Sequence, residues 1–573
     1  MSSELMERAE TEKKAHESSC FILKIEETLA KGKFFKLSLI LLFVCMFVYG
    51  ISNVKEYGRS WDEEFDLEIL QSNWVEYGIR LFPENSKIGK LALESGITPI
   101  SVYVERDHGC APYYAFGFIY MFLKDDSASM VYAWHSYTFC LYFLGVIAVW
   151  FLLKEIYGSL LLSTLGTLFY YFTPRFFAEG HYNNKDMVFL TLVTASALFA
   201  VLAAKKLASR EKGSLSCAIA FSLLSGFMMN VKIIGIAIWG LLGLFAIIYV
   251  ITRGKNVKKS VWITIFFTIV LSIAMYLILT PASWVGIGEF LEYLLTNALH
   301  FHSSRWDNYI RFKGTLIRPV EIGMPYSYLP TWMLITIPAY ITILFSLSVL
   351  SFVITIVKER GKNIVKEDSD FFFLMLLIGF MAPFCFAVVK SHSEIFYNSW
   401  RHMFFLYAFM LPGGIYFLYK LLIGLKAATV KRKRIAELAY ALVTVAFLTC
   451  AGEMIANRSF EYVYYNPISR LIIDVNDYEG DYWMVSVVPA LRRFGDEFYD
   501  GEHPLYVDCV WYEYHGADES MIDKNKIEFT DSVNADYFIY NPSGSFDWED
   551  VGNYNKVFSI NRFGVELTGI YAK

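Results

Sequence analysis

Residues 186–210 read DMVFLTLVTASALFAVLAAKKLASR, and the pattern of this stretch recurs along most of the chain. Its first 19 residues are apolar apart from Asp186 and a few hydroxyl groups, and a helix needs about 20 such residues to cross the hydrocarbon core of a bilayer. Lys205, Lys206 and Arg210 follow at once, which is typical of the cytoplasmic end of a membrane span. The stretch therefore predicts a transmembrane helix that begins at the outer surface and ends at the inner one.

Apolar runs of similar length predict eleven spans. They lie at 36–53, 131–153, 158–174, 186–204, 215–231, 233–252, 261–280, 330–357, 371–390, 401–424 and 435–456. Basic clusters follow the spans that end near residues 204, 252, 357 and 424, and residues 1–36 carry seven Lys and Arg. These segments alternate, so an N-terminus in the cytoplasm puts all of them inside, as the positive-inside rule requires. Eleven spans then place the residues after 456 on the extracytoplasmic side.

Charge is unevenly distributed between these regions. Residues 457–573 hold 21 Asp and Glu against 9 Lys and Arg, a net charge of −12, whereas the whole chain carries −5. An acidic tail beside a basic membrane body argues against nucleic-acid binding, which needs clustered cations. It fits a tail that lies away from the anionic cytoplasmic surface.

The expected fold is a polytopic α-helical membrane protein with three parts. Residues 1–35 form a cytoplasmic segment, 36–456 the membrane body, and 457–573 a small extracytoplasmic α/β domain. Helical spacing at 480–499 and strand patterns at 504–510, 535–540, 556–560 and 565–572 predict the elements of this domain.

Two long extracytoplasmic loops, 54–130 and 281–329, contain apolar pieces that are too short to span a bilayer. Tyr113–Leu123 and Gly288–Phe301 therefore predict amphipathic helices that lie along the membrane surface. Long loops with structure of their own usually carry function. Cys110 and Cys509 are the two cysteines able to meet outside the membrane, and whether they pair stays open.

Near its start, a few residues past the first span, the first outer loop contains Trp61-Asp62-Glu63-Glu64. Adjacent carboxylates near a bilayer can act as a general base, as metal ligands or as a hydrogen-bond clamp. The alternative is a solvated start of a helix, where Asp and Glu are favoured by the helix dipole.

A second group follows the third span, in the sequence PRFFAEGHYNNKD at 174–186. Arg175, His181 and Lys185 can hold a phosphate, and an Asp at the start of a span, here Asp186, is unfavourable unless it is paired or functional. The alternative is that the cations reach to the interface and that Asp186 caps the helix.

A third group opens the tenth span with Tyr397, Arg401 and His402. Arg binds phosphate bidentately and His can add a hydrogen bond, although both also anchor helices at the interface. Weaker candidates are His300, His302, Arg305 and Trp306 in the loop before the eighth span, and a metal site of His392, Glu394 and His402, whose spacing matches no ligand pattern. Carboxylates in one loop and cations in two others suggest a substrate with a lipid phosphate and a group that needs deprotonation.

The ordered set of motifs resembles the GT-C superfamily of membrane glycosyltransferases, in the branch of the protein O-mannosyltransferases and the aminoarabinose transferase of lipid A. The resemblance covers most of residues 36–485. The segments that carry it are Trp61–Glu63, Pro174–Phe177 with His181 and Asn184–Asp186, Tyr397–His402, Tyr464–Pro467 and Asp481–Trp483. The sequence departs from the branch at His108-Gly-Cys-Ala-Pro112, where His-Pro-Pro is usual, which leaves the role of His108 in doubt.

The resemblance implies a hexosyl- or pentosyltransferase of the bacterial cytoplasmic membrane. It would move a sugar from a polyprenyl-phosphate carrier to an extracytoplasmic glycan, lipid or protein, with inversion at the anomeric carbon. By similarity, Asp62 would orient or deprotonate the acceptor with help from Glu63, and Asp186 would be the second acidic residue. The groups expected to bind the phosphate are Lys185, Arg401, Arg175, His181 and His402. Whether the enzyme needs a divalent metal, Mg or Mn, stays open, and Asp62 and Asp186 are the residues that would hold one.

Two other classes remain open. A transporter or flippase of lipid-linked sugars predicts inverted repeats and charges near the bilayer midplane, whereas no repeat is found and the charged groups lie at the ends of spans. A non-catalytic assembly factor would use the acidic tail to bind a partner. Deletion of 457–573 separates these classes, because an enzyme is expected to keep its donor site in the membrane body. The identity of the sugar depends on a few hydrogen bonds that spacing does not reveal.

Overall fold

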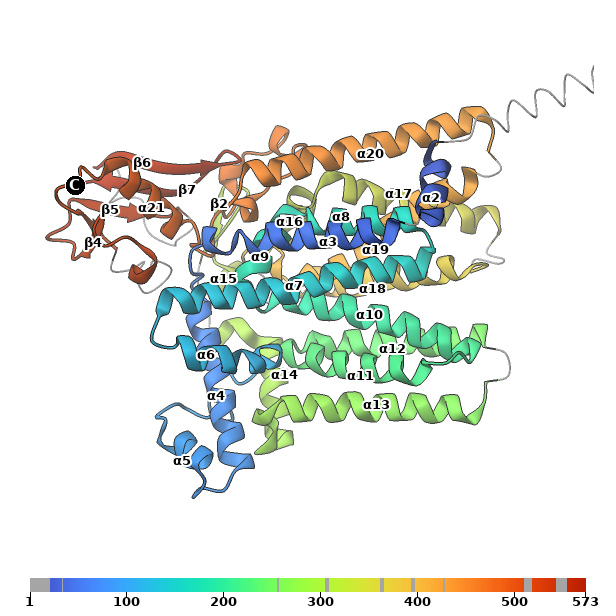
Figure 1. Ribbon diagram of the computed structural model, residues 1–573, viewed down its shortest axis with the longest axis horizontal. Helices are drawn as coiled ribbons and strands as arrows, with labels where there is room; N and C mark the ends of the chain where they lie inside the picture. The colour runs from blue at the N-terminus through green and yellow to red at the C-terminus, as the bar shows by residue number, and fades with distance from the viewer. Residues whose placement is uncertain are drawn as a thin grey trace, which may run out of the picture.

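The computed structural model describes residues 21–32, 34–254, 257–304, 309–360, 365–392, 397–425, 428–509, 518–542 and 554–573, with the backbone alone for 298–304. Figure 1 shows long helices running side by side, with a C-terminal sheet and the helices of the first outer loop at one end of the bundle. Most of the expected cytoplasmic segment 1–35 lies outside the described residues.

Ten helices in the described part of the chain are long and apolar enough to cross a membrane, so the chain is an integral membrane protein. They match ten of the eleven expected spans. The helices are α3 Phe35–Ile51, α7 Ser127–Tyr157, α10 Asp186–Ser209, α11 Ser214–Val231, α12 Ile234–Arg253, α13 Lys259–Leu279, α17 Ala339–Lys358, α18 Asp368–Lys390, α19 Tyr407–Gly424 with η4 Arg401–Leu406 before it, and α20 Val430–Ala456. A short helix, α2 Phe21–Lys31, precedes them.

The span expected at 158–174 differs from a single helix. It consists of α8, Leu160–Tyr171, and α9, Pro174–Tyr182, and α8 alone is only about 18 Å long at 1.5 Å per residue. Lys205 near the end of α10 pairs with Glu155 near the end of α7 at 3.0 Å, so these two helices run in the same direction. The chain between them must cross back, and α8 and α9 together make that crossing. Pro174 starts the second helix, because it cannot supply the N–H that would continue the first.

The eighth span is also interrupted. α16 (Tyr328–Thr336) ends just before Pro338, and α17 begins at Ala339. A residue that precedes proline is pushed out of the helical conformation, and Ile337 is extended, with ψ of 138°. The apolar run at 330–357 therefore contains two helices instead of one.

The two long outer loops are built from short elements. The first contains η1 Val54–Glu56, α4 Glu63–Leu81, α5 Lys87–Glu94, η2 Ala111–Phe116 and α6 Gly117–Leu123; the second contains η3 Pro281–Trp284, α14 Ile287–Ser304, β1 Ile310–Phe312, β2 Thr315–Ile317 and α15 Pro319–Ile322. Phe118, Met121 and Phe122 of α6 are exposed. Exposed apolar side chains at the outer end of a bundle suit a helix that lies on the membrane surface, as expected.

The C-terminal part forms the expected α/β domain. Its elements are η6 Glu461–Val463, η7 Ser469–Leu471, η8 Val475–Asp477, α21 Val487–Phe498, β3 Leu505–Asp508, η9 Glu519–Met521, β4 Ile527–Thr530, β5 Tyr537–Tyr540, β6 Asn555–Arg562 and β7 Val565–Ala572. The strands form one mixed sheet in the order β4-β3-β5-β7-β6, in which β3 is parallel to β4 and β5. The helix and four strands match the expectation, and β4 was not predicted because only Ile527 of its four residues is buried.

The membrane body and the tail share one hydrophobic core. Phe460, Tyr464, Tyr482 and Trp483 belong to the same buried cluster as the membrane helices, whereas the sheet packs on α21 around a second cluster. The polypeptide beyond the last membrane helix therefore first completes the outer end of the bundle and only then forms the sheet.

Gly109 provides a test of how the first outer loop is attached. A Cβ atom at this position would lie 1.9 Å from the backbone oxygen of Asn230 at the end of α11, and backbone cannot move aside easily. Gly109→Ala is expected to lower the free energy of unfolding by about 1–3 kcal/mol, measured in detergent by chemical denaturation. Gly243→Ala in α12 is the matched control, because nothing lies within 4 Å of its added Cβ. Equal stability of the two variants would contradict this attachment.

Candidate active site

Arg401 lies at the centre of a buried charged cluster at the end of the bundle that carries the C-terminal sheet. It begins η4, and its Nη1 is 3.7 Å from Oδ2 of Asp62 and 3.4 Å from Oδ2 of Asp186. Asp62 precedes α4 and Asp186 begins α10, so the cluster joins three segments that are far apart in the sequence. The side chain of Arg401 is only 5% exposed, whereas that of Asp62 is 31% exposed. Asp62 is therefore the carboxylate of this cluster that faces an approaching molecule.

The carboxylate of Asp186 is held on several sides. Asn183 donates from Nδ2 to Asp186 Oδ2 at 3.1 Å, and its Oδ1 accepts from the Asp186 backbone N–H at 2.8 Å. Lys232 places its Nζ against the other carboxylate oxygen. Lys232 lies in the two-residue link between α11 and α12. Asp186 thus has two cations and an amide as partners.

Lys185 and Asp66 form a further ion pair beside this cluster. Lys185 Nζ is 2.5 Å from Asp66 Oδ1, and Asp66 is buried in the first turn of α4. Burial lowers the pKa of Lys185, but the carboxylates of Asp66 and Asp62 outweigh it and hold that pKa above its usual range. Lys185 therefore stays a cation at neutral pH.

Aromatic rings surround the guanidinium of Arg401. The ring centroids of Tyr397, Tyr482 and Trp483 lie 4.9, 5.3 and 4.6 Å from its Cζ atom. Trp61, next to Asp62, packs edge-on against Tyr482 at 5.0 Å. Arg401 Nε is buried and makes no hydrogen bond with the described residues. A buried N–H without a partner is uncommon in folded proteins, so this donor is available to a bound anion.

The sequence-predicted residues divide into two groups. The structure brings Asp62, Lys185, Asp186 and Arg401 together, and His402 follows Arg401 with its ring 4.9 Å from that of Tyr397. Glu63 lies apart from this group, because its Oε1 accepts from the Ser60 backbone at 3.1 Å and meets His135 Nε2 at 2.9 Å.

Arg175 and His181 also lie in internal packing positions. Arg175 donates from Nε to the Tyr464 carbonyl at 3.2 Å and lies over the rings of Trp332 and Tyr465. The two ring nitrogens of His181 meet the carbonyls of Phe177 at 2.9 Å and Gly50 at 3.0 Å. Both side chains are buried, and these contacts tie α9 to its neighbours rather than direct the side chains at Asp62.

Two members of the cluster, Asp66 and Lys232, were missed by the sequence analysis, although each carried a signal. Asp66 follows Asp62 by four residues, which places both on one face of a helix. Lys232 is a lone charge between two apolar spans, and such a residue is unfavourable unless it has a partner.

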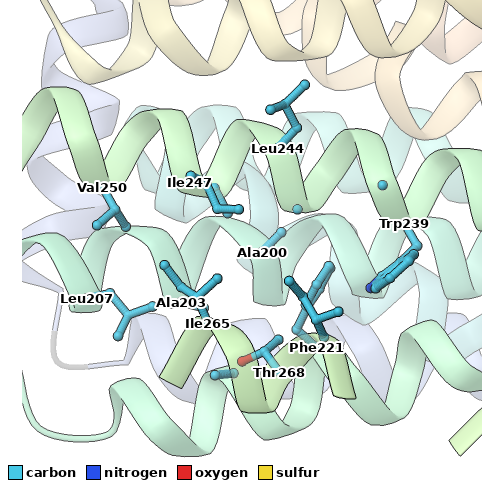
Figure 2. Close-up of a pocket in the computed structure, with 15 residues that line it drawn as sticks. Ala200, Ala203, Leu207, Phe221, Trp239, Leu244, Ile247, Val250, Ile265 and Thr268 are labelled. Carbon is cyan, nitrogen blue, oxygen red and sulfur yellow. The ribbon is translucent and has the colours of Figure 1, made fainter. Parts of the chain in front are cut away.

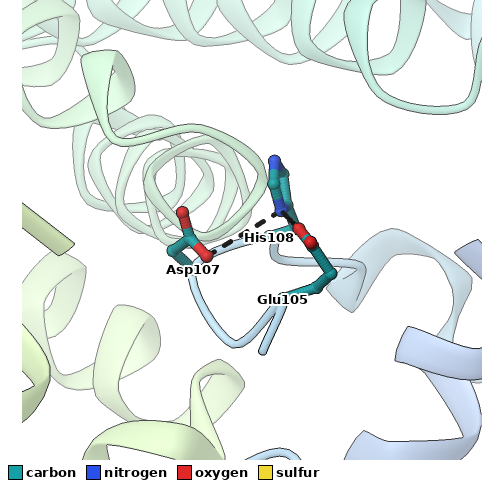
Figure 3. Close-up of side chains that lie close together, drawn as sticks. All are labelled: Glu105, Asp107 and His108. Carbon is teal, nitrogen blue, oxygen red and sulfur yellow. Dashed lines mark ion pairs between the residues drawn. The ribbon is translucent and has the colours of Figure 1, made fainter. Parts of the chain in front are cut away.

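Three residues of the first outer loop could hold a divalent metal. Glu105, Asp107 and His108 each offer a ligand atom, and these atoms lie within 4.8 Å of one another. Figure 3 shows the three side chains close together. His108 Nδ1 is 2.7 Å from Glu105 Oε2 and 3.9 Å from Asp107 Oδ1. One imidazole and two carboxylates suit zinc or manganese. His108 therefore has Glu105 of the same loop as its ion-pair partner.

Other sequence-based candidates lie elsewhere. Cys110 carries a free thiol, so it forms no disulfide with Cys509. His392 Nδ1 meets the Met324 carbonyl at 3.0 Å. The described residues do not include the side chains of His300, His302, Arg305 and Trp306. Glu394 lies outside them as well, so the expected metal site of His392, Glu394 and His402 is not described as a whole.

An apolar cavity of about 220 Å³ lies among α10, α11, α12 and α13, away from the charged cluster. Figure 2 shows its lining of aliphatic and aromatic side chains, with Trp239 at one end and Leu207 and Val250 at the other. Small residues, including Ala200, Ala203, Gly240 and Gly243, leave the space. Its walls suit a hydrocarbon chain, but nothing in them can carry out chemistry.

Comparison with protein-family models and with curated proteins gives no match. Among solved structures, the chain is similar to ArnT from Cupriavidus metallidurans, in the apo state at 12% identity and bound to undecaprenyl phosphate at 11%, both with a TM-score of 0.44. The two alignments cover 94% and 93% of this chain and 98% of those chains. It is also similar to the archaeal oligosaccharyltransferase AglB from Archaeoglobus fulgidus, in complex with an inhibitory peptide and a dolichol-phosphate, at 11% identity and a TM-score of 0.43 over 84% of this chain and 64% of that one. At these identities, the function of this chain has to be inferred from its own residues.

The pair of Lys185 and Asp66 provides a test of the charged cluster. Asp66→Asn leaves a largely buried ammonium without its carboxylate, and breaking a buried pair costs about 3–5 kcal/mol. Lys185 keeps 23% exposure, so a loss of about 1–3 kcal/mol in the free energy of unfolding is expected. Adding Lys185→Met to Asp66→Asn should recover part of the lost free energy of unfolding, because the unpaired charge is then removed. Unchanged stability of Asp66→Asn would contradict the pairing.

Proposed function

We propose that this protein is a membrane glycosyltransferase that moves a sugar from a polyprenyl-phosphate carrier to an extracytoplasmic acceptor. The observation that carries the proposal is one partly exposed carboxylate, Asp62, beside a buried arginine whose Nε has no hydrogen-bond partner in the part of the chain that the structure describes. Lys185 and Lys232 add two further cations within the same network. This combination provides a place for an anion next to a group that can accept a proton.

The charges of the cluster explain how a phosphate would enter. Among the described residues of the cluster, three carboxylates face three cations, so a bound phosphate takes a cation from a carboxylate. The contact between Arg401 and Asp62 is the longest of these, at 3.7 Å against 3.4 Å for Arg401 and Asp186, and it lies well beyond the 2.7–2.9 Å of a charge-assisted hydrogen bond. The carrier phosphate therefore displaces Asp62 from Arg401 and leaves Asp62 free at the site of reaction.

The reaction then needs two roles from these residues. Asp62 orients the acceptor hydroxyl and takes its proton as the acceptor oxygen bonds to the anomeric carbon. The bond between that carbon and the carrier phosphate breaks, and the carrier leaves as its phosphate with the bonding electrons. Arg401, Lys185 and Lys232 stabilise the charge that develops on the phosphate in a buried setting, where such interactions are strong. Direct displacement inverts the anomeric carbon.

Asp186 has a positioning role in this proposal. Its carboxylate contacts both Arg401 and Lys232, and Asn183 fixes its orientation. A divalent cation at Asp62 and Asp186 does not fit these residues, because Arg401 approaches both carboxylates and Lys232 contacts one of them, and like charges repel. The proposed reaction therefore uses no metal ion at these two carboxylates. Glu63, Arg175 and His181 are assigned to the internal packing described above.

The orientation follows from the same cluster. Asp186 begins α10 in the charged cluster, and Lys205 and Lys206 lie at the opposite end of that helix. The positive-inside rule places that end in the cytoplasm, so the cluster and the sheet face the extracytoplasmic side of a bacterial cytoplasmic membrane. A carrier with its phosphate in the outer leaflet meets the cluster at that level, and the acceptor is a glycan, lipid or protein of the cell envelope.

The test compares cell-envelope glycans by mass spectrometry in cells with and without the gene. The wild-type gene should restore a glycan that Asp62→Asn does not restore, because the amide cannot accept a proton, and transfer should fall at least about 100-fold. Membrane levels of the two proteins should be equal.

Glu84→Gln is the control, because Glu84 is an exposed carboxylate of the same loop, and it should restore the glycan fully. A glycan profile that is independent of the gene would contradict the transferase, whereas full restoration by Asp62→Asn would contradict only the assignment of Asp62.

A further inference from the structure

Two of the three rings around Arg401 come from the polypeptide beyond the last membrane helix. Tyr482 and Trp483 follow α20 by more than 25 residues, yet both contact the guanidinium. Their centroid distances fall within the range of about 6 Å at which a ring attracts a cation. Both side chains are buried, so each contact is shielded from water.

The backbone that presents Arg401 also meets this segment. Asn398 and Ser399 have φ angles of +52° and +60°, which are unfavourable for residues other than glycine, and both are buried. Glu479 faces their backbone N–H groups, and burial raises the pKa of Glu479 to about 7. The strained turn is thus held in place by a carboxylate from the C-terminal part.

The rings themselves are fixed by the tail. Asp481, next to Tyr482, accepts from the Ser486 backbone N–H at 2.9 Å and from Asn541 Nδ2 at 3.2 Å. Asn541 directly follows strand β5 of the sheet. On the other side, Trp483 packs against Tyr182 of α9 with centroids 5.8 Å apart. A continuous series of contacts therefore connects the sheet to Arg401.

We propose that Tyr482 and Trp483 are positioning residues for Arg401, which makes the C-terminal part an integral piece of the donor site. The inference rests on the proposed function for the role of Arg401. A ring attracts the guanidinium through its π face and uses none of its N–H donors as a carboxylate would. The rings can therefore fix the cation while its unpartnered Nε remains available to a phosphate.

This arrangement changes one expectation from the sequence. The membrane body at 36–456 was expected to keep the donor site after removal of the tail. Because two walls around Arg401 and the support of its turn come from residues 479–483, deletion of 457–573 would remove them together with the sheet. Loss of activity on deletion is therefore expected for an enzyme as well as for a scaffold.

The first test needs no substrate. Phenylglyoxal modifies arginine side chains, and the rate at Arg401 can be followed by peptide mass spectrometry on protein in nanodiscs. Trp483→Leu and Tyr482→Leu should each raise that rate about tenfold, because the guanidinium of Arg401 then loses one of the rings that cover it.

Trp483→Phe should stay within twofold of the wild type, because the phenyl ring keeps the π face. Trp332→Leu is the matched control, because Trp332 stacks on Arg175 instead, and it should leave the rate at Arg401 unchanged. Unchanged rates in both leucine variants would overturn the inference.

The second test measures binding of undecaprenyl phosphate to the same proteins. Arg401→Gln and Trp483→Leu should each weaken binding about tenfold, while Trp483→Phe should recover it, which a merely structural role of the side chain would not predict. Weakening by Arg401→Gln without any effect of Trp483→Leu and Tyr482→Leu would overturn the positioning role. If Arg401→Gln itself binds like the wild type, the proposed role of Arg401 fails, and the modification rates still decide whether the rings position it.

Discussion

The burial of one guanidinium is the constraint on which the sheet-bearing end of the helix bundle depends. Removing a charge from water costs several kcal/mol unless it is compensated, and Arg401 is compensated by carboxylates and by aromatic rings, although its Nε has no hydrogen-bond partner among the described residues. Asp62 and Asp186 approach it as carboxylates, and Tyr397, Tyr482 and Trp483 as rings. These groups come from the first outer loop, from the start of α10, from the segment before η4 and from the tail. Holding one cation therefore determines how four parts of the chain meet.

The same compensation explains why the cluster is suited to an exchange of anions. Among the described residues, three cations meet three carboxylates in this cluster, and in the proposed reaction a phosphate enters in exchange for a carboxylate. Asp62 is the member with the longest ion-pair contact and the most exposed side chain. In the proposed reaction, the group that the phosphate displaces is also the group that accepts the proton. Binding of the donor and activation of the acceptor are then two results of one exchange.

Much of this arrangement could be predicted from the sequence, because topology alone determines which span ends share a membrane face. Lys185, Asp186 and Arg401 stand at the ends of spans and Asp62 lies in the loop that follows one, all on the same predicted face of the membrane, and that placement was enough to bring them together. The pairing of Asp66 with Lys185 and of Lys232 with Asp186 depends on how helices pack side by side, which periodicity does not show. Glu63, Arg175 and His181 have the same residue types as site residues, but local carbonyls, rings and His135 hold them inside. The contact of Arg401 with Trp483 joins residues 82 positions apart, and no local pattern predicts it.

The account is tested most directly by a cryo-electron-microscopy structure of the protein with undecaprenyl phosphate in a nanodisc. The phosphate should lie within hydrogen-bond distance of Arg401 Nε and close to Lys185 or Lys232, with Asp62 moved off the guanidinium and Tyr482 and Trp483 unmoved. A phosphate bound elsewhere, with Arg401 still between Asp62 and Asp186, would contradict the central claim that this buried arginine receives the phosphate of the lipid carrier.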